Sequence, residues 1–300
     1  ETQLIKLTSW GSIQLEGADS RTYLNSQVTA HINQLEPDQA CFGSHCDAKG
    51  KSWSHFYFIP TGGDACQLFQ RKSSIAPSLS ALNKYGVFSR TDITDNSDEL
   101  TWYALLSEST ADSNIHKATH HLDSTRVSLA PGIELLAIPK GTDLSALALG
   151  DVIESDEAHF EKALVERAIV FIHGQHASEY VPHMLNLQAT DGISFNKGCY
   201  MGQETVARMR YLGKNKRAAF PFTGTADTIN INDTLEIQSG DNWRRAGTVV
   251  SSCQIEQQIY GIAVCAADIN SEQTLRVKND ETSQLSLMPL PYTLEYKATK

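Results

Sequence analysis

Cys199 is the residue whose setting in this 300-residue chain points most directly to chemistry. Gly198 and Gly202 flank it, and glycines let a backbone turn tightly and come close to a partner. The residues after Gly202 have the apolar spacing of a short helix, so Cys199 lies just before a helix N-terminus. Lys197 and that N-terminus both place positive potential near the sulfur, which favours the thiolate. We therefore expect Cys199 to be a functional thiol and Lys197 to be its activator.

Two observations keep a purely structural role for this cysteine open. A lone cysteine is often no more than a small apolar residue in the core. In addition, Glu204 lies in the first turn of the expected helix, over residues 203–211, where a carboxylate competes for the same helix dipole. The opposing effects of Lys197 and Glu204 on the thiol leave both roles possible.

A concentrated basic segment follows the cysteine motif. Five basic residues lie within ten positions with no acidic residue among them, and we call them the basic cluster: Arg208, Arg210, Lys214, Lys216 and Arg217. The chain as a whole has a net charge of −10, but a local cluster can still attract an anion. Phosphates of RNA, such as tRNA, or the glutamyl tail of a folate are suitable anions. A solvated helix end is the alternative, because cations also suit a helix C-terminus.

The composition is that of a globular protein that does not cross a membrane. Hydrophobic residues make up 41% of the chain, none of their runs is long enough to span a bilayer, and residues 1–4 do not resemble a secretory signal. We expect a cytoplasmic protein. The six cysteines form no C-x-x-C pair, which favours reduced thiols. His120-His121 and His173-x-x-His176 could ligate a metal, but locally bonded histidines are more common, and we predict no metal site.

The spacing of apolar residues predicts an α+β part followed by a small β-barrel. In the first part we expect strands at 12–16, 40–46, 52–59, 67–70, 87–93 and 100–106, and helices beginning near Ser20 and over 73–85 and 111–122. A further helix over 156–169, capped by Ser155, has acids in its first turn. Short runs at 218–223, 234–238, 246–251, 259–266 and 275–277, separated by turn residues, suggest the barrel.

Several motifs occur together in this chain. They are Lys197-Gly198-Cys199-Tyr200-x-Gly202-Gln203-Glu204, Gly17-Ala18-Asp19-Ser20, Gln27-Val28-Thr29, His45-Cys46-Asp47-Ala48-Lys49-Gly50-Lys51, Asn186-Leu187-Gln188, Lys216-Arg217, Asn242-Trp243-Arg244-Arg245-x-Gly247-Thr248-Val249 and Pro289-Leu290-Pro291-Tyr292. Together they resemble the YgfZ family, within the wider aminomethyltransferase-like superfamily, over nearly the whole chain. The bacterial tRNA-modifying, folate-binding branch of that family is the one they most resemble.

The resemblance implies an α+β, three-domain aminomethyltransferase-like fold, with two α+β domains around a central channel and a C-terminal β-barrel. The implied domains are a discontinuous folate-binding domain, 1–46 with 125–215, a second α+β domain, 47–124, and the barrel, 216–300. The resemblance also implies a tetrahydrofolate or a derivative in the channel. It implies support of iron–sulfur enzymes, including a tRNA methylthiotransferase, and an effect on replication initiation. We expect a monomer.

Two aromatic positions are associated with folate in the resembled family, and they correspond to Trp10 and Phe160. The second is usually Trp, so Phe160 departs from the pattern. A phenyl ring can still stack on a pterin, but the indole N–H donor is lost. Core packing is the alternative for Phe160, because it lies on the apolar face of the expected helix.

The resemblance does not extend to the carboxylates of the parent enzyme. Aminomethyltransferases carry a pair of Asp residues before a strand, and Trp53 and Ser54 stand there in this chain. Neither can act as a carboxylate in proton transfer. Asp47 is near in sequence, but its position in a turn explains it. We therefore expect an accessory protein rather than an enzyme, with a folate-dependent aminomethyl transferase and an RNA-binding adaptor as alternatives.

Overall fold

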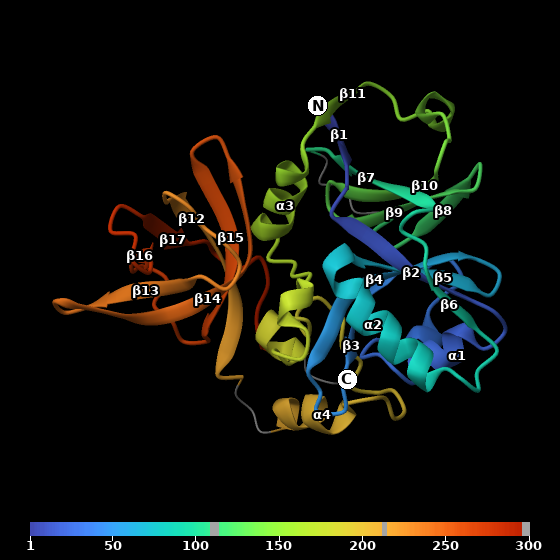
Figure 1. Cartoon of the computed structure of the whole chain (residues 1–300), viewed down its shortest axis with the longest axis horizontal. Helices are drawn as coiled ribbons and strands as arrows, with labels where there is room; N and C mark the ends of the chain where they lie inside the picture. The colour runs from blue at the N-terminus through green and yellow to red at the C-terminus, as the bar shows by residue number, and fades with distance from the viewer. Residues whose placement is uncertain (109–113, 212–214, 296–300) are drawn as a thin grey trace.

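The computed structural model describes residues 1–108, 114–211 and 215–295. Two open sheets lie on one side of the molecule and a closed barrel lies on the other, with a helix between them (Figure 1). This arrangement confirms the expected α+β fold with a C-terminal β-barrel. No helix in the described ranges is long and apolar enough to cross a membrane.

The first sheet has six strands in the order β11-β1-β7-β10-β9-β8. Their bounds are β1 Thr2–Lys6, β7 Leu100–Leu106, β8 Ala118–His121, β9 Ser124–Ala130, β10 Ile133–Pro139 and β11 Val152–Ser155. β1 pairs antiparallel with β7 and parallel with β11, so the start of the chain lies beside residues 152–155. One 3₁₀ helix, Leu144–Leu147, lies in the connection from β10 to β11.

The second sheet has five strands in the order β3-β4-β5-β2-β6. Their bounds are β2 Trp10–Glu16, β3 Cys41–Cys46, β4 Ser52–Gly62, β5 Ala65–Arg71 and β6 Asp92–Asp95. Two helices, α1 (Ser20–Asn25) and α2 (Lys72–Tyr85), pack on one face, together with a 3₁₀ helix at Ile32–Gln34. The other face packs on the first sheet, and the largest apolar core of the molecule lies between the two sheets.

The barrel closes in the order β12-β15-β14-β13-β16-β17. Its strands are β12 Arg217–Thr225, β13 Thr234–Ser239, β14 Asn242–Ile255, β15 Gln258–Ala266, β16 Leu275–Val277 and β17 Gln284–Leu287. Alternate residues of these strands fill the interior, among them Phe222, Val249 and Leu285, which are fully buried. Closure leaves no unpaired strand edge to aggregate, which suits a barrel of this small size.

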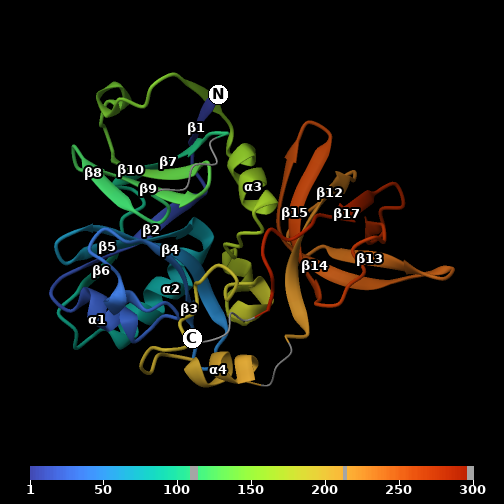
Figure 2. The same cartoon turned by 180° about the vertical axis from the view of Figure 1, so that it is seen from behind.

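Helix α3 (Glu157–Glu166) lies between the sheets and the barrel (Figures 1 and 2). Its Phe160 and Leu164 belong to the core between the sheets, whereas Val165 belongs to a core shared with barrel strands. Asp156, and not Ser155 as expected, caps it: the Asp156 carboxylate accepts a hydrogen bond from the Ala158 N–H at 3.0 Å. Two 3₁₀ helices, Gly174–His176 and Pro182–Leu185, follow before α4 (Gln203–Tyr211).

The structure corrects one further expectation about the elements. The expected helix over 111–122 is wrong for the part that is described, because β8 lies there and pairs with β9; residues 109–113 lie outside the described ranges. Strands β1, β9, β10, β11 and β17 were not expected. The expected domain boundary between residues 46 and 47 falls inside the β3–β4 hairpin, so the division into domains stays a prediction.

Candidate functional site

The loop that carries Cys199 is built on a close contact between two glycine turns. Gly202 has a φ of +80°, and a Cβ there would lie 2.5 Å from the carbonyl oxygen of Asp47. Gly50, in the turn that joins β3 to β4, has a φ of +75°, and its Cβ would lie 2.7 Å from Cβ of Thr205. Both positions therefore require glycine. The β3–β4 turn packs against the start of α4 and fixes where that helix begins.

Lys197 is buried beneath this loop and serves as an anchor. Its side chain is 7% exposed, and its ammonium donates hydrogen bonds to the carbonyl oxygens of Asn25, Val28 and Ala30 at 2.6 to 2.7 Å. An ammonium has three N–H donors, so all of them are used and none remains for the thiol of Cys199. Burial lowers the pKa of Lys197 to about 7, while the three acceptors favour its charged form.

Cys199 itself is exposed above that anchor. The neighbouring Tyr200 is buried, and the Met201 N–H donates to the carbonyl oxygen of Ser26 at 3.1 Å, so the loop is fixed on the side after the cysteine. A Cβ on Gly198 would meet nothing within 4 Å, so the side before the cysteine is open. The thiol is thus presented to solvent on a fixed backbone. Its expected activation by Lys197 has no hydrogen bond to rest on and stays a prediction.

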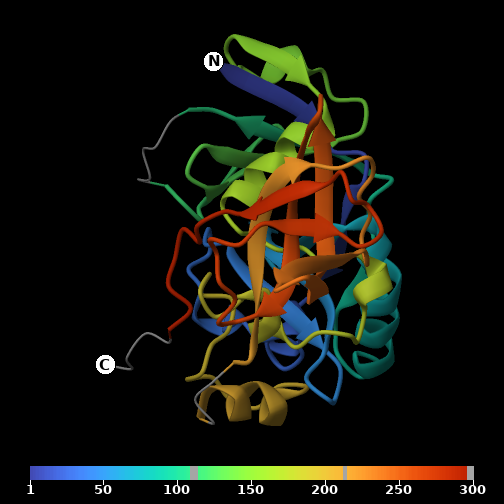
Figure 3. The same ribbon diagram turned by 90° about the vertical axis from the view of Figure 1, so that its left-hand side faces the viewer.

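The basic cluster continues from this loop along α4, which lies at one end of the molecule (Figures 1 and 3). Arg208 pairs with Glu204 at 2.6 Å, and both side chains are largely exposed. Arg210 lies over the ring of Phe195, 4.5 Å from its centroid. Lys216 and Arg217 are exposed at the start of β12. Lys214 lies outside the described residues.

The structure adds two cations to this region that the sequence did not assign to it. Lys49 and Lys51 belong to the β3–β4 turn, which packs on the start of α4. The carboxylate of Asp47 accepts the backbone N–H groups of both lysines at 2.9 Å, which confirms its role in the turn. A contact between residues this far apart in the chain leaves no signal in local spacing. We call these two lysines together with the described members of the basic cluster the basic surface.

Trp10 and Phe160, the two residues that the resemblance associates with folate, lie side by side. Their ring centroids are 5.2 Å apart in an edge-on arrangement. They are only 1% and 0% exposed. The ring of Phe69 stacks on the indole at 5.0 Å, and the guanidinium of Arg71 lies over it at 4.5 Å.

These contacts decide how the two residues fit a folate. Protein groups cover the ring faces that would stack on a pterin, so in this structure Trp10 and Phe160 fit the core and not a stacked ligand. One polar group of this cluster lacks a partner: the Nε1–H of Trp10 is buried and has no hydrogen-bond acceptor among the described residues. Buried N–H groups normally have an acceptor. The central channel implied by the resemblance stays a prediction.

Trp53 and Ser54, at the place of the aminomethyltransferase carboxylates, lie on β4. Ser54 is buried and donates to the hydroxyl of Ser78 at 3.3 Å, and His45 also bonds that hydroxyl at 2.9 Å. On the same strand, the hydroxyl of Ser52 is hydrogen-bonded to the imidazole of His55 at 3.2 Å. Burial lowers the pKa of both histidines to about 4, so both are neutral at pH 7. This buried network offers no carboxylate and no opening to a substrate.

One histidine of each pair considered in the sequence analysis has a hydrogen-bond partner within the protein. His120 bonds the hydroxyl of Thr125 at 3.1 Å, and His176 bonds the amide oxygen of Asn232 at 2.9 Å. Within the described ranges, no three His, Cys, Asp or Glu side chains are arranged to hold a metal ion. All six cysteines are free thiols.

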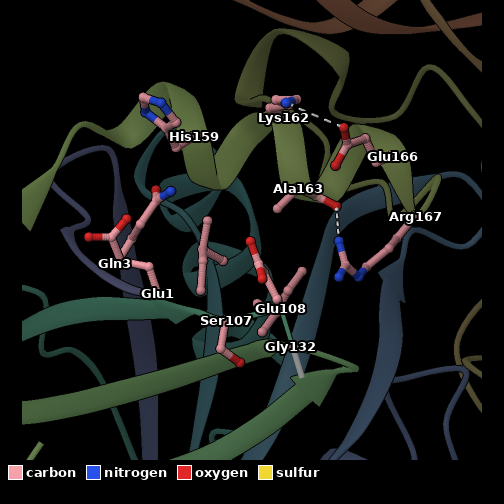
Figure 4. Close-up of a pocket in the computed structure, with 12 residues that line it drawn as sticks. Glu1, Gln3, Ser107, Glu108, Gly132, His159, Lys162, Ala163, Glu166 and Arg167 are labelled. Atoms are coloured by element: carbon pink, nitrogen blue, oxygen red, sulfur yellow. Dashed lines mark hydrogen bonds and ion pairs between the residues drawn. The ribbon is translucent and has the colours of Figure 1, made fainter. Parts of the chain in front are cut away.

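A pocket of about 330 Å³ lies between α3 and the edge of the first sheet (Figure 4). Three of its charged groups have partners: Lys162 pairs with Glu166 at 3.5 Å, and Arg167 donates to the carbonyl oxygens of Ala163 and Pro131. Its described lining includes neither Cys199 nor Trp10 nor Phe160. We therefore take the Cys199 loop and the basic surface as the candidate site.

The protein has an aminomethyltransferase-like fold. The crystal structure of glycine cleavage system aminomethyltransferase T from Bartonella henselae superposes with a TM-score of 0.71 over 98% of this chain and 87% of that one, at 13% sequence identity. At that identity the likeness concerns the fold alone.

The sequence relatives are more specific. The family model for the YgfZ β-barrel domain matches residues 215–280. A protein of Sodalis glossinidius named tRNA-modifying protein YgfZ is 37% identical over 97% of this chain and 93% of its own length. Proteins of the same name from Pectobacterium atrosepticum and Aliivibrio fischeri are 36% and 35% identical, over 97% and 96% of this chain and 92% of their own length. The chain belongs to the YgfZ family.

Proposed function

We propose that this protein is a cytoplasmic accessory factor in tRNA modification, which contacts tRNA through the basic surface and presents the Cys199 thiol beside it. A role in tRNA modification is supported by the relatives that are named tRNA-modifying proteins. One observation of the structure carries the proposal: the exposed thiol of Cys199 lies on the loop just before α4, the helix that carries Arg208 and Arg210. Phosphate binding by such cations is the sequence-independent part of RNA recognition.

We further propose that the step supported is the one performed by iron–sulfur enzymes, such as a tRNA methylthiotransferase. The support for this finer proposal is chemical: an accessible thiol is the group that a sulfur- or cluster-handling partner would engage. The other five cysteines are less accessible, and burial raises the pKa of each of them to about 12: Cys41, Cys46, Cys66, Cys253 and Cys265. Cys199 is the accessible thiol of the chain.

The experiment is complementation of a bacterial strain from which the strain's own YgfZ-family gene has been deleted. Methylthiolated nucleosides in total tRNA are measured by mass spectrometry in cells that produce the wild-type chain, Cys199→Ala or Cys253→Ala. Cys253 is a matched control, because it is a partly buried thiol on the barrel. We expect the Cys199 variant to lose the modification and the Cys253 variant to keep it. Full modification with Cys199→Ala, at equal protein levels, would show that the thiol has no role.

We also propose that a reduced folate binds at the Trp10–Phe160 cluster. The aminomethyltransferase-like fold supports this proposal, and so does the unpartnered Nε1–H of Trp10. Because the ring faces are covered, binding there requires α3 or β5 to shift. No carboxylate stands at Trp53 or Ser54, so we expect binding without transfer of a one-carbon group.

Calorimetric titration with tetrahydrofolate tests this second proposal. The variants are Trp10→Phe, which keeps an aromatic ring in the core but removes the N–H, and Trp243→Phe, a matched change on the barrel. We expect saturable binding that the first variant weakens and the second does not. Equal affinity in all three proteins, or no binding to the wild type, would show that folate does not bind at this site.

A further inference from the structure

Tyr211 is the last residue of α4, and its side chain is 78% exposed. Glu204, Arg208 and Tyr211 follow one another at helical spacing, so they form one stripe along the helix. Val206, on the opposite side, is fully buried in the core between the sheets. The core therefore explains the inner side of α4, but it does not explain an aromatic ring on the outer side.

Cations flank Tyr211 in the chain: Arg208 and Arg210 precede it, and Lys216 and Arg217 follow it. Arg208 lies one turn before it, and Lys216 and Arg217 are exposed where the described chain resumes. The pair between Arg208 and Glu204 is exposed on both sides, so water screens it and a phosphate can replace the carboxylate. Protein interfaces place aromatic residues in an apolar centre and disfavour lysine there. An aromatic ring among cations is instead typical of surfaces that bind single-stranded nucleic acid.

We propose that Tyr211 is a stacking platform for an unpaired base of RNA, whose neighbouring phosphates are held by Arg208, Lys216 and Arg217. This inference rests on the proposed contact with tRNA and specifies which part of the RNA is bound: a single-stranded loop or end. Bases inside an RNA duplex are stacked on one another, and a duplex presents phosphates and hydroxyl groups for which an aromatic ring is of no use. Only an unpaired base can place its face on the ring of Tyr211.

Binding of two short RNAs to the full chain tests the inference. One is a single strand that carries 2-aminopurine, whose fluorescence falls when it stacks, and the other is a duplex of the same sequence. We expect Tyr211→Ala to weaken single-strand binding roughly 5- to 100-fold and to abolish the quenching, as removal of one stacked base does. We expect Tyr211→Phe, which keeps the ring, to retain both. Tyr85→Ala, a change of another exposed tyrosine, is the matched control on α2.

Salt dependence separates this inference from the proposed function. Tyr211→Ala removes no charge, so the slope of log affinity against log salt concentration should stay unchanged. Arg217→Met should reduce that slope by about 0.7 for the single strand, because one phosphate contact is lost. If Tyr211→Ala binds the single strand as well as the wild type does, the stacking role is wrong and the phosphate contacts stand. If the wild type binds neither RNA, or binds heparin equally well, both proposals fail.

Discussion

At the scale of single residues, Lys197 stands out because its role differs from the one its place in the motif suggests. Its ammonium donates to three carbonyl oxygens of residues 25–30 and so holds the Cys199 loop on the end of α1 and the segment that follows it. A buried charge of this kind is stable only while its acceptors remain. Lys197 is therefore a positioning residue for the Cys199 loop. Its replacement would loosen both that loop and residues 25–30.

We predict that Lys197→Met lowers the free energy of unfolding by about 3 kcal/mol or more, because buried carbonyl oxygens lose their donors. Urea unfolding measures this loss. Hydrogen exchange of the Thr29 and Met201 amides, which bond Ser44 and Ser26, should report local loosening. Lys216→Met, an exposed lysine, is the control and should change stability by no more than about 0.5 kcal/mol. Equal stability of the two variants would mean that Lys197 is no anchor.

The buried histidines of the β3–β4 hairpin predict how stability changes with pH. Burial lowers the pKa of His45 from 6.5 to about 4 in the folded protein, so between these values the unfolded chain binds more protons. Stability therefore falls as the pH drops from about 6.5 towards about 4, by up to about 1.4 kcal/mol per pH unit for each such histidine. His45→Asn should reduce this slope by up to about 1.4 kcal/mol per pH unit, as measured by urea unfolding at several pH values. An unchanged slope in His45→Asn would contradict the assignment.

At the scale of elements, the start of α4 depends on the contact between two turns. We predict that Gly202→Ala costs about 1–3 kcal/mol, because its φ is positive and its Cβ would meet the Asp47 carbonyl oxygen. Gly198→Ala is the matched change on the other side of Cys199, where a Cβ meets nothing, and it should be tolerated. Thermal unfolding of the two variants measures the difference. Similar midpoints for both would show that the α4 start is not fixed by this contact.

Local spacing was sufficient for elements whose partners lie nearby in the chain. Helix α2 and the barrel strands β12 to β16 lie where the apolar spacing predicts them. Strands β1 and β11 were missed because β1 pairs with β7 and β11, about 100 and 150 residues away, and such pairing leaves no local pattern. Strand β8 pairs with the adjacent β9, but it is short and mostly exposed and was taken for part of a helix.

The candidate site could be predicted only in part. The exposed Cys199 and the cations of α4 follow from residue types within one segment. The sequence gives no sign that Lys197 turns inward, because its acceptors lie in residues 25–30, or that the turn at Lys49 meets α4. Trp10 and Phe160 do lie together, but their covered faces are a property of packing between sheets and helix.

At the scale of the whole molecule, one buried ion pair connects parts that are distant in the chain. Arg71, at the end of β5, donates two hydrogen bonds to the Glu161 carboxylate on α3, at 2.6 and 2.8 Å, and a third to the carbonyl oxygen of Phe171. Because α3 also packs on the barrel, this pair lies where the second sheet, the helix and the barrel meet. Removal of one partner would leave a buried guanidinium without its counter-charge.

We predict that Glu161→Gln, which keeps the shape of the side chain, lowers the free energy of unfolding by about 3 kcal/mol, in line with the loss of one partner of a buried pair. Glu166→Gln is the matched control on the same helix: its pair with Lys162 is exposed, so its loss should cost less than about 1 kcal/mol. Urea unfolding followed by circular dichroism gives both values. If the two variants are equally stable, the contact between the second sheet and α3 depends on apolar packing alone, and the shift of α3 that we propose for folate binding would not have to break an ion pair.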